Sequence, residues 1–282
     1  MNRLIVVLLA ASTMTLTSRM DTATAPAEVT RKVYISATDS KGVPVTDLAA
    51  ADITVKEGGK ERPVASLQPA SAPVHVAILV DDAGTGAFQA AVFNFIQKVH
   101  GRGQFAISLL NPQAIRIVDF TEDVDALKNA LGRLGARGRL QPDGDQMPEA
   151  IAETAKVMQQ RKVERPVILA MTIAGGQLHS VEPDNVLRIL RASGAALSVL
   201  CITGADLGQV MGDGPKQSGG RIEEVGTGPA IGPAAIRLAD TLLNQYLLTY
   251  TLPDGVKMAD RISVTTSRKG ISLTSPSRIA DK

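Results

Sequence analysis

The centre of the chain alternates between short apolar segments and longer segments in which apolar residues recur every three or four positions. The apolar segments are residues 74–80, 166–171 and 196–202, and strands covered on both faces have this composition. Apolar residues recur at helical spacing in 87–100, 124–134, 147–158, 183–192 and 233–246. This alternation predicts an α/β fold, with a mainly parallel sheet and helices on both faces.

Two further strands are expected at residues 104–110 and 115–120, and a glycine-rich segment at 204–232 interrupts the alternation. The ends of the chain differ, because apolar and polar residues alternate singly there, as in half-buried strands. Such strands are expected at 33–38, 53–57, 63–67, 247–252, 262–266 and 271–274. We expect the two flanks to pair in one small accessory sheet.

The first residues have the order of a secretory leader. Arg3 precedes an apolar run at 4–11, and Ala23, Thr24 and Ala25 form a site suited to a signal peptidase. The alternative is a buried strand or helix at the N-terminus. The sequence thus predicts a signal peptide at 1–25, an accessory β unit at 26–72, an α/β domain at 73–246 and C-terminal strands at 247–282. The protein is expected to be exported to the periplasm or secreted, with no transmembrane segment after leader removal.

Composition narrows the range of partners. The formal net charge is +2, from 30 basic and 28 acidic residues, and the chain has 5 Phe, 3 Tyr and no Trp. Neither a basic stripe nor aromatic stacking positions stand out, so we expect no nucleic-acid partner. Cys201 is the only cysteine and lies in an apolar run, which predicts a buried small hydrophobe and no internal disulfide.

Motifs in both flanks resemble one family. The segment 33–59 (VYISATDSKGVPVTDLAAADITVKEGG) carries the matching positions Asp39, Gly42, Val45, Leu48, Asp52, Val55 and Glu57. Near the other end, QYLLTY at 245–250 and SGGR at 218–221 also match. Over about residues 30–278 the chain resembles a von Willebrand factor type A (VWA) domain of the exported bacterial VWFA-related proteins. The resemblance implies a Rossmann-like, VWA-like fold and a role as a protein-interaction or scaffold module.

The family also implies a metal-ion-dependent adhesion site at the strand ends, whose first loop reads D-x-S-x-S. Here the loop is Asp81-Asp82-Ala83-Gly84-Thr85, so Ala83 replaces a serine hydroxyl. The family threonine of the second loop corresponds to Asp145, and Ile173 stands where the third loop has an aspartate. A Mg²⁺ or Ca²⁺ ion, which prefers oxygen ligands, would depend on Asp81, Thr85, Asp145 and water. We therefore expect a degenerate metal site, no cofactor, and a partner protein that binds without a metal ion. The alternative is metal-dependent adhesion at a remodelled site.

Two enzyme classes are weaker alternatives. A buried strand followed by Gly84-Thr85-Gly86 resembles a dinucleotide-binding turn, but Gln89 stands where the pattern requires its third glycine. Motifs of serine and zinc hydrolases are missing from the sequence. Three histidines (His75, His100 and His179) and the acidic pair Asp143 and Asp145 are better explained as structural or solvated side chains. The sequence predicts a protein that is not an enzyme.

Overall fold

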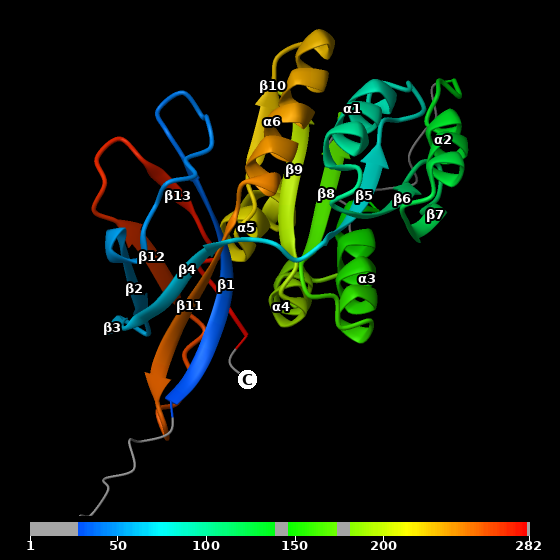
Figure 1. Cartoon of the computed structure of the whole chain (residues 1–282). Coiled ribbons are helices and arrows are strands. Elements are labelled where there is room, and N and C mark those ends of the chain that lie inside the picture. Colours follow the sequence, from blue (N-terminus) through cyan, green and yellow to red (C-terminus); the bar gives the residue numbers. More distant parts are fainter. Residues whose placement is uncertain (1–27, 139–145, 174–180, 281–282) are drawn as a thin grey trace, which may run out of the picture.

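The computed structural model describes residues 28–138, 146–173 and 181–280. Its centre is a six-stranded sheet with the order β10-β9-β8-β5-β6-β7 (Figure 1). All neighbouring strands are parallel except β6 and β7, which are antiparallel. The strands are β5 (Val74–Asp81), β6 (Gly103–Leu109), β7 (Ile115–Thr121), β8 (Pro166–Thr172), β9 (Ala196–Ile202) and β10 (Ile222–Val225).

Six helices cover this sheet: α1 (Gln89–Val99), α2 (Val124–Arg133), α3 (Met147–Gln160), α4 (Pro183–Ser193), α5 (Gly208–Ser218) and α6 (Ile231–Leu243). Alternate side chains of β5 enter two separate apolar cores. Val76 and Ile78 pack in the core formed with α1, α2 and α6. Ala77 and Leu79 pack in the core formed with α3, α4 and α5. The predicted α/β sheet with helices on both faces is therefore confirmed.

The strand order places a topological switch point at β5. The chain runs from β5 to β6 on one side and later returns to β8 on the other side. Strands β8 and β5 end together, because Asp81 lies opposite Thr172 in the parallel register. Open α/β sheets bind their ligands at the carboxyl ends of strands beside such a point. A ligand-binding site is therefore expected at the edge where β8, β5 and β6 end.

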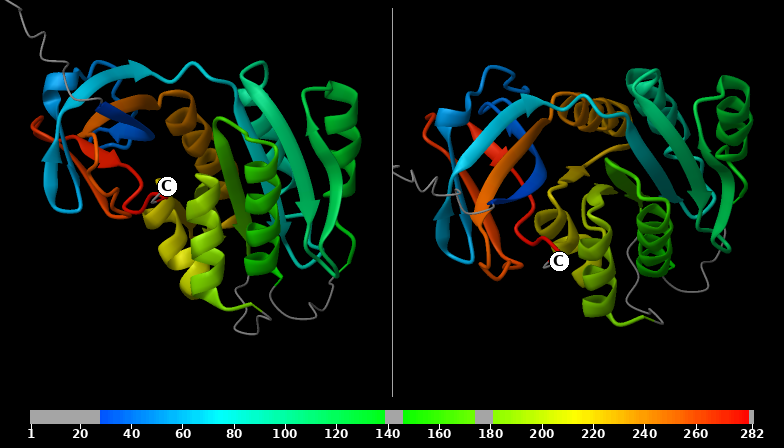
Figure 2. Two further views of the ribbon diagram at one scale, coloured as in Figure 1. Left: turned by 90° about the horizontal axis from the view of Figure 1, so that it is seen from below. Right: turned by 60° about the horizontal axis from the view of Figure 1, so that its bottom comes forward.

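Both flanks of the chain form an accessory β unit, made of β1–β4 and β11–β13. Its strands are β1 (Glu28–Thr38), β2 (Ile53–Glu57), β3 (Lys60–Arg62), β4 (Val64–Pro69), β11 (Tyr246–Pro253), β12 (Ile262–Thr266) and β13 (Ser272–Thr274). They form two antiparallel sheets, β13-β1-β11-β4 and β12-β2-β3, where we expected one. Val33 of β1 pairs with Leu248 of β11, and both belong to an apolar core that the two sheets share. The views in Figure 2 show this unit beside the six-stranded sheet.

Several boundaries differ from the sequence predictions. The glycine-rich segment is ordered, because it contains α5, β10 and a short 3-10 helix (Gly228–Ala230); a second such helix is Ala50–Asp52. The strand expected at 63–67 is β4, which begins at Val64, and the short strand β3 before it was not predicted. Helix α6 ends at Leu243, so that Tyr246 begins β11. The predicted signal peptide lies outside the described residues. Within the described part of the chain, none of the helices is long and apolar enough to cross a membrane.

Candidate functional site

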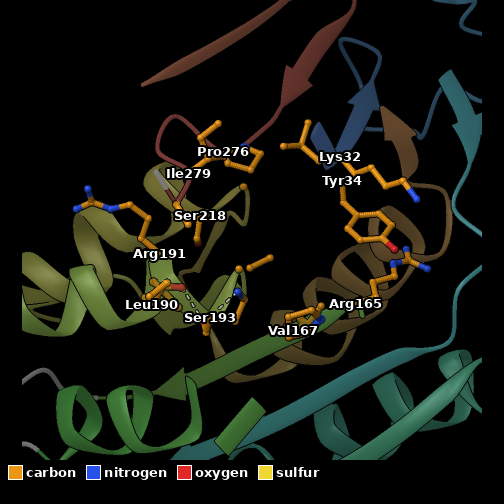
Figure 3. A pocket seen from close by; sticks show the side chains of 18 of the residues that line it. Lys32, Tyr34, Arg165, Val167, Leu190, Arg191, Ser193, Ser218, Pro276 and Ile279 are labelled. Atoms are coloured by element: carbon orange, nitrogen blue, oxygen red, sulfur yellow. Dashed lines mark hydrogen bonds between the residues drawn. The ribbon is translucent and has the colours of Figure 1, made fainter. Parts of the chain in front are cut away.

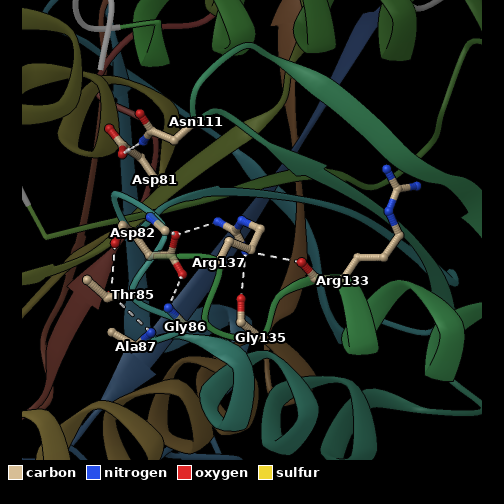
Figure 4. A network of polar contacts seen from close by, with 10 residues as sticks. Asp81, Asp82, Thr85, Gly86, Ala87, Asn111, Arg133, Gly135 and Arg137 are labelled. Carbon is tan, nitrogen blue, oxygen red and sulfur yellow. Dashed lines mark hydrogen bonds and ion pairs between the residues drawn. The ribbon is translucent and has the colours of Figure 1, made fainter. Parts of the chain in front are cut away.

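Three strands end at one edge of the six-stranded sheet and bring polar groups together there. Asp81 is the last residue of β5, and its carbonyl oxygen accepts a hydrogen bond of 3.2 Å from the amide of Ile173, just after β8. The side-chain amide of Asn111, after β6, donates to the Asp81 carboxylate (Figure 4). Asp81 is thus held between its two neighbouring strands. The first predicted ligand does lie at the strand-end edge.

Asp82 organises the loop that follows β5. One carboxylate oxygen accepts the Gly84 amide at 2.9 Å, and the other accepts the Gly86 amide at 2.8 Å. Ala83 and Gly84 have φ angles of 48° and 79°, which turn the loop back over the carboxylate. The Asp82 side chain is 1% exposed. Asp82 is therefore a buried structural anchor of this loop rather than a solvated side chain at the end of the strand.

Arg137 supplies the counter-charge for Asp82. Its guanidinium donates to the Asp82 carboxylate at 2.8 Å and is 24% exposed. The same guanidinium donates to the carbonyl oxygens of Arg133 and Gly135, each at 3.1 Å. The Arg137 amide in turn donates to the Gly84 carbonyl at 2.8 Å. A positive charge is therefore fixed against the loop that follows β5.

Gly86 allows this close approach. A Cβ atom at this position would lie 2.7 Å from the backbone nitrogen of Ala136, closer than real carbon atoms approach. Its φ of 77° is also one that side chains disfavour. The glycine that resembles part of a phosphate-binding turn is thus explained by packing between the β5–α1 loop and the segment after α2.

The hydrogen bonds within this loop also determine whether its backbone amides are available to bind a phosphate group. A phosphate-binding turn points its backbone amides at the ligand. Here the amides of Gly84 and Gly86 donate to the Asp82 carboxylate, which is itself negatively charged. The described loop therefore lacks the donor arrangement that a dinucleotide would need.

The described residues also fit a divalent cation poorly. The Thr85 hydroxyl donates to the Asp82 carbonyl oxygen at 2.8 Å and accepts the Ala87 amide at 3.3 Å, so it serves its own loop. Figure 4 shows Asp81 and Thr85 on either side of Asp82. Ile173 packs against the apolar core and offers no oxygen from its side chain. Among the described residues, no group of three or more His, Cys, Asp or Glu could hold a metal ion. The third predicted ligand, Asp145, lies outside the described residues.

A groove of about 390 Å³ runs beside this loop, and we call it the strand-end groove. It is lined by residues from the β6–β7 connection and from the end of α2: Leu109, Asn111, Pro112, Ile115, Gly132, Arg133, Gly135, Ala136 and Arg137. Ile115 is 47% exposed. The groove therefore combines an exposed apolar side chain with two guanidinium groups. No sequence pattern predicted this groove, because its residues come from two separate segments that share no motif.

Cys201, His75 and His100 lie in or beside strands and helices of the α/β domain. Cys201 is 2% exposed, and burial, with a smaller effect from Glu224, raises the pKa of its thiol. This disfavours the reactive thiolate. His75 lies in β5, with its ring 5.7 Å from that of Phe120, and His100 directly follows α1. His179 and Asp143 lie outside the described residues.

Neither a protein-family model nor a curated protein matches this sequence. Solved structures that match include a von Willebrand factor type A protein from Catenulispora acidiphila, with 11% identity, 91% of this chain and 75% of that chain covered, and a TM-score of 0.47. An aerotolerance-related membrane protein from Bacteroides fragilis matches with 14% identity, coverage of 60% and 98%, and a TM-score of 0.44. The manganese-loaded TRAP protein of Plasmodium vivax matches with 11% identity, coverage of 74% and 95%, and a TM-score of 0.46. These likenesses concern the fold alone. The α/β architecture predicted from the sequence, a mainly parallel sheet with helices on both faces, rests on the strand order and the packing of the two cores.

Proposed function

We propose that this protein is an exported, non-catalytic interaction module that holds a partner protein at the strand-end edge without a bridging metal ion. The observation that carries this proposal is the ion pair of 2.8 Å between Asp82 and Arg137. In this pair, the Asp82 carboxylate and the Arg137 guanidinium bind each other within the loop region. In a VWA-like domain with metal-dependent adhesion, a cation bridges this edge to the partner. Because Arg137 neutralises Asp82, this carboxylate no longer attracts a cation to the loop.

The strand-end groove supports a direct mode of contact. Ile115 offers exposed apolar surface, and Arg133 and Arg137 line the same groove. Guanidinium groups bind carboxylates through paired hydrogen bonds. A partner segment that places an apolar side chain next to an aspartate or glutamate would match this groove. The carboxylate that a metal ion would otherwise bind is then bound by the exposed Arg133, because the Arg137 guanidinium is already paired with Asp82.

Export of the protein is part of the same proposal. It is supported by the order of charge, apolar run and small residues within 1–25. The mature chain is then expected to begin near Pro26. Mass spectrometry of protein recovered from outside the cytoplasm tests this, and recovery of residues 1–25 on that protein would contradict it.

The test of the interaction uses a photo-crosslinking amino acid at Ile115, in cells that make the protein naturally. The control carries it at Ile222, an exposed residue of β10 at the far edge of the same sheet. We expect an adduct of defined mass from position 115 and none from position 222. The adduct should persist in EDTA and weaken at least tenfold when Arg133→Glu is added.

Two outcomes would contradict the proposal. Loss of the adduct in EDTA, with recovery on adding Mg²⁺ or Ca²⁺, would favour metal-dependent adhesion through Asp81, Thr85 and Asp145. Equal adducts from positions 115 and 222 would mean that the strand-end groove is not a specific surface.

A further inference from the structure

A second cavity lies between the accessory β unit and the α/β domain, near the start of β8 and β9 rather than at their ends. We call it the inter-unit pocket. Its volume is about 320 Å³, within the range of sites for small molecules. The accessory β unit contributes Lys32 and Tyr34 of β1 to its lining, and the α/β domain contributes Arg165, Leu190 and other residues (Figure 3). A molecule in this pocket would touch both units at once.

The lining of the inter-unit pocket is positively charged. Its basic residues are Arg31, Lys32, Arg165, Arg191 and Arg278, and its acidic residue is Glu164. Two acids outside the lining pair with some of these cations. Arg31 pairs with Glu57 at 3.2 Å, while Arg191 and Arg278 share the single carboxylate of Asp260. Five positive charges thus face three negative ones, and two positive charges are left over.

Arg165 is a main source of this excess. The residue is 3% exposed, and its guanidinium donates only to neutral acceptors: the carbonyl oxygens of Ala72 and Leu242 and the side-chain oxygen of Gln245. Within the described part of the chain, its buried Nε atom has no hydrogen-bond partner. Its guanidinium carbon lies 5.2 Å from the centre of the Tyr34 ring. A buried cation without a carboxylate is costly, and an anionic ligand in the pocket would reduce that cost.

The rest of the lining is largely apolar. Val163, Val167, Leu190, Pro276 and Ile279 contribute to it. A charged end and an apolar body are the two features that recognise an amphipathic anion. Inorganic phosphate alone would use only the first of them.

We propose that the inter-unit pocket binds a small organic anion, whose carboxylate or phosphate lies at Arg165 and Lys32 and whose short apolar body lies against the valine and leucine side chains. Guanidinium and ammonium groups both bind such oxyanions. Because β1 supplies Lys32 and Tyr34, the ligand holds the accessory β unit against the α/β domain. This role is independent of the strand-end groove.

The test uses calorimetric titration and thermal melts of the mature protein with octanoate and octyl phosphate. Octanol and octylamine, which lack a negative charge, are the controls for the charge. Inorganic phosphate, which lacks an alkyl chain, is the control for the apolar body. We expect one or both of the amphipathic anions to bind and to raise the melting temperature. Binding of octanoate alone assigns a carboxylate, and binding of octyl phosphate alone assigns a phosphate. Equal binding of octanol, or of inorganic phosphate, would overturn the proposal.

Lys32→Glu tests the location of the anion, because Lys32 is exposed and the change does not disturb a core. The dissociation constant should rise at least tenfold in this variant. Lys60→Glu, an equally exposed change in β3, should leave it unchanged. Arg165→Gln should abolish binding, with folding checked by circular dichroism, and Lys32→Glu decides the matter if that variant does not fold. An unchanged dissociation constant in Lys32→Glu would overturn the proposal.

Discussion

The Asp82 carboxylate and the Arg137 guanidinium lie 2.8 Å apart, although 55 positions separate them in the chain. The pair joins the loop after β5 to the segment after α2. It also explains why a pair of aspartates follows a buried strand here. Asp81 faces the neighbouring strand end at Asn111, while Asp82 turns inward and closes its own loop.

We predict that Arg137→Met lowers the free energy of unfolding by about 2 kcal/mol, because Asp82 stays buried and loses its counter-charge. The value is below that for a fully buried pair, since the Arg137 side chain is 24% exposed. Urea unfolding measures it. Arg161→Met is the matched control, because Arg161 pairs with Asp119 at 2.7 Å but both side chains are about half exposed. That change should cost less than about 1 kcal/mol, and equal costs for the two variants would refute the structural role of Arg137.

The sequence predicted the architecture well because its signal is a spacing of apolar residues. A strand that is buried on both faces is uniformly apolar, and a helix that is buried on one face is amphipathic. The strands β5, β8 and β9 were found where these patterns predicted them. The pairing of the flanks was also expected, and Val33 does lie opposite Leu248. The boundaries of the predicted domains stay a prediction.

The sequence predicted the candidate site only in part, because contacts between distant segments leave no local pattern. Asp81 was identified through the resemblance of its loop to the family's first metal-binding loop, but the role of Asp82 depends on Arg137, which belongs to no motif. The helix α5 was missed because glycines usually weaken helices. In the structure, Gly214 of α5 packs beside Leu197 of β9, where a Cβ would lie 2.7 Å from a leucine methyl. Tertiary packing, which the pattern cannot express, selects glycine there.

Two glycines of this missed region should respond in opposite directions to alanine. Gly212 lies in α5, and a Cβ there meets nothing within 4 Å, so Gly212→Ala should stabilise the protein by about 0.5–1 kcal/mol. A Cβ at Gly220 would lie 1.8 Å from the carbonyl oxygen of Leu197. Gly220→Ala should therefore destabilise by about 2 kcal/mol or more, through forced backbone movement. Chemical denaturation of both variants checks this, and stabilisation by Gly220→Ala would show that the segment between α5 and β10 does not lie so close to β9.

We predict that Cys201 in the folded protein does not react with a thiol reagent such as DTNB at pH 8. Burial blocks access, and the raised pKa of the thiol keeps it protonated at a pH where a free cysteine is partly thiolate. The thiol should react fully in urea. Ala90→Cys in a Cys201→Ala background is the control, since position 90 is exposed on α1. Rapid labelling of native Cys201 would reopen a catalytic or redox role.

The last prediction concerns the metal ion, and it rests on the oxygens that the strand-end edge lacks. Millimolar Mg²⁺ or Ca²⁺ should not raise the melting temperature of the wild type or of Asp81→Ala. A cation present at one hundred times its dissociation constant would stabilise the folded protein by about 2.7 kcal/mol. The melting temperature of a domain of this size rises by about 2–4 °C for each kcal/mol of stabilisation. Ala83→Ser with Ile173→Asp supplies a new hydroxyl and a new carboxylate that do not depend on Thr85 or Asp82, and the Ile173 amide already contacts the Asp81 carbonyl oxygen. The double variant should therefore gain a cation-dependent rise that Asp81→Ala removes. A rise in the wild type that disappears in Asp81→Ala would instead establish a working metal site and make metal-dependent adhesion the leading mechanism.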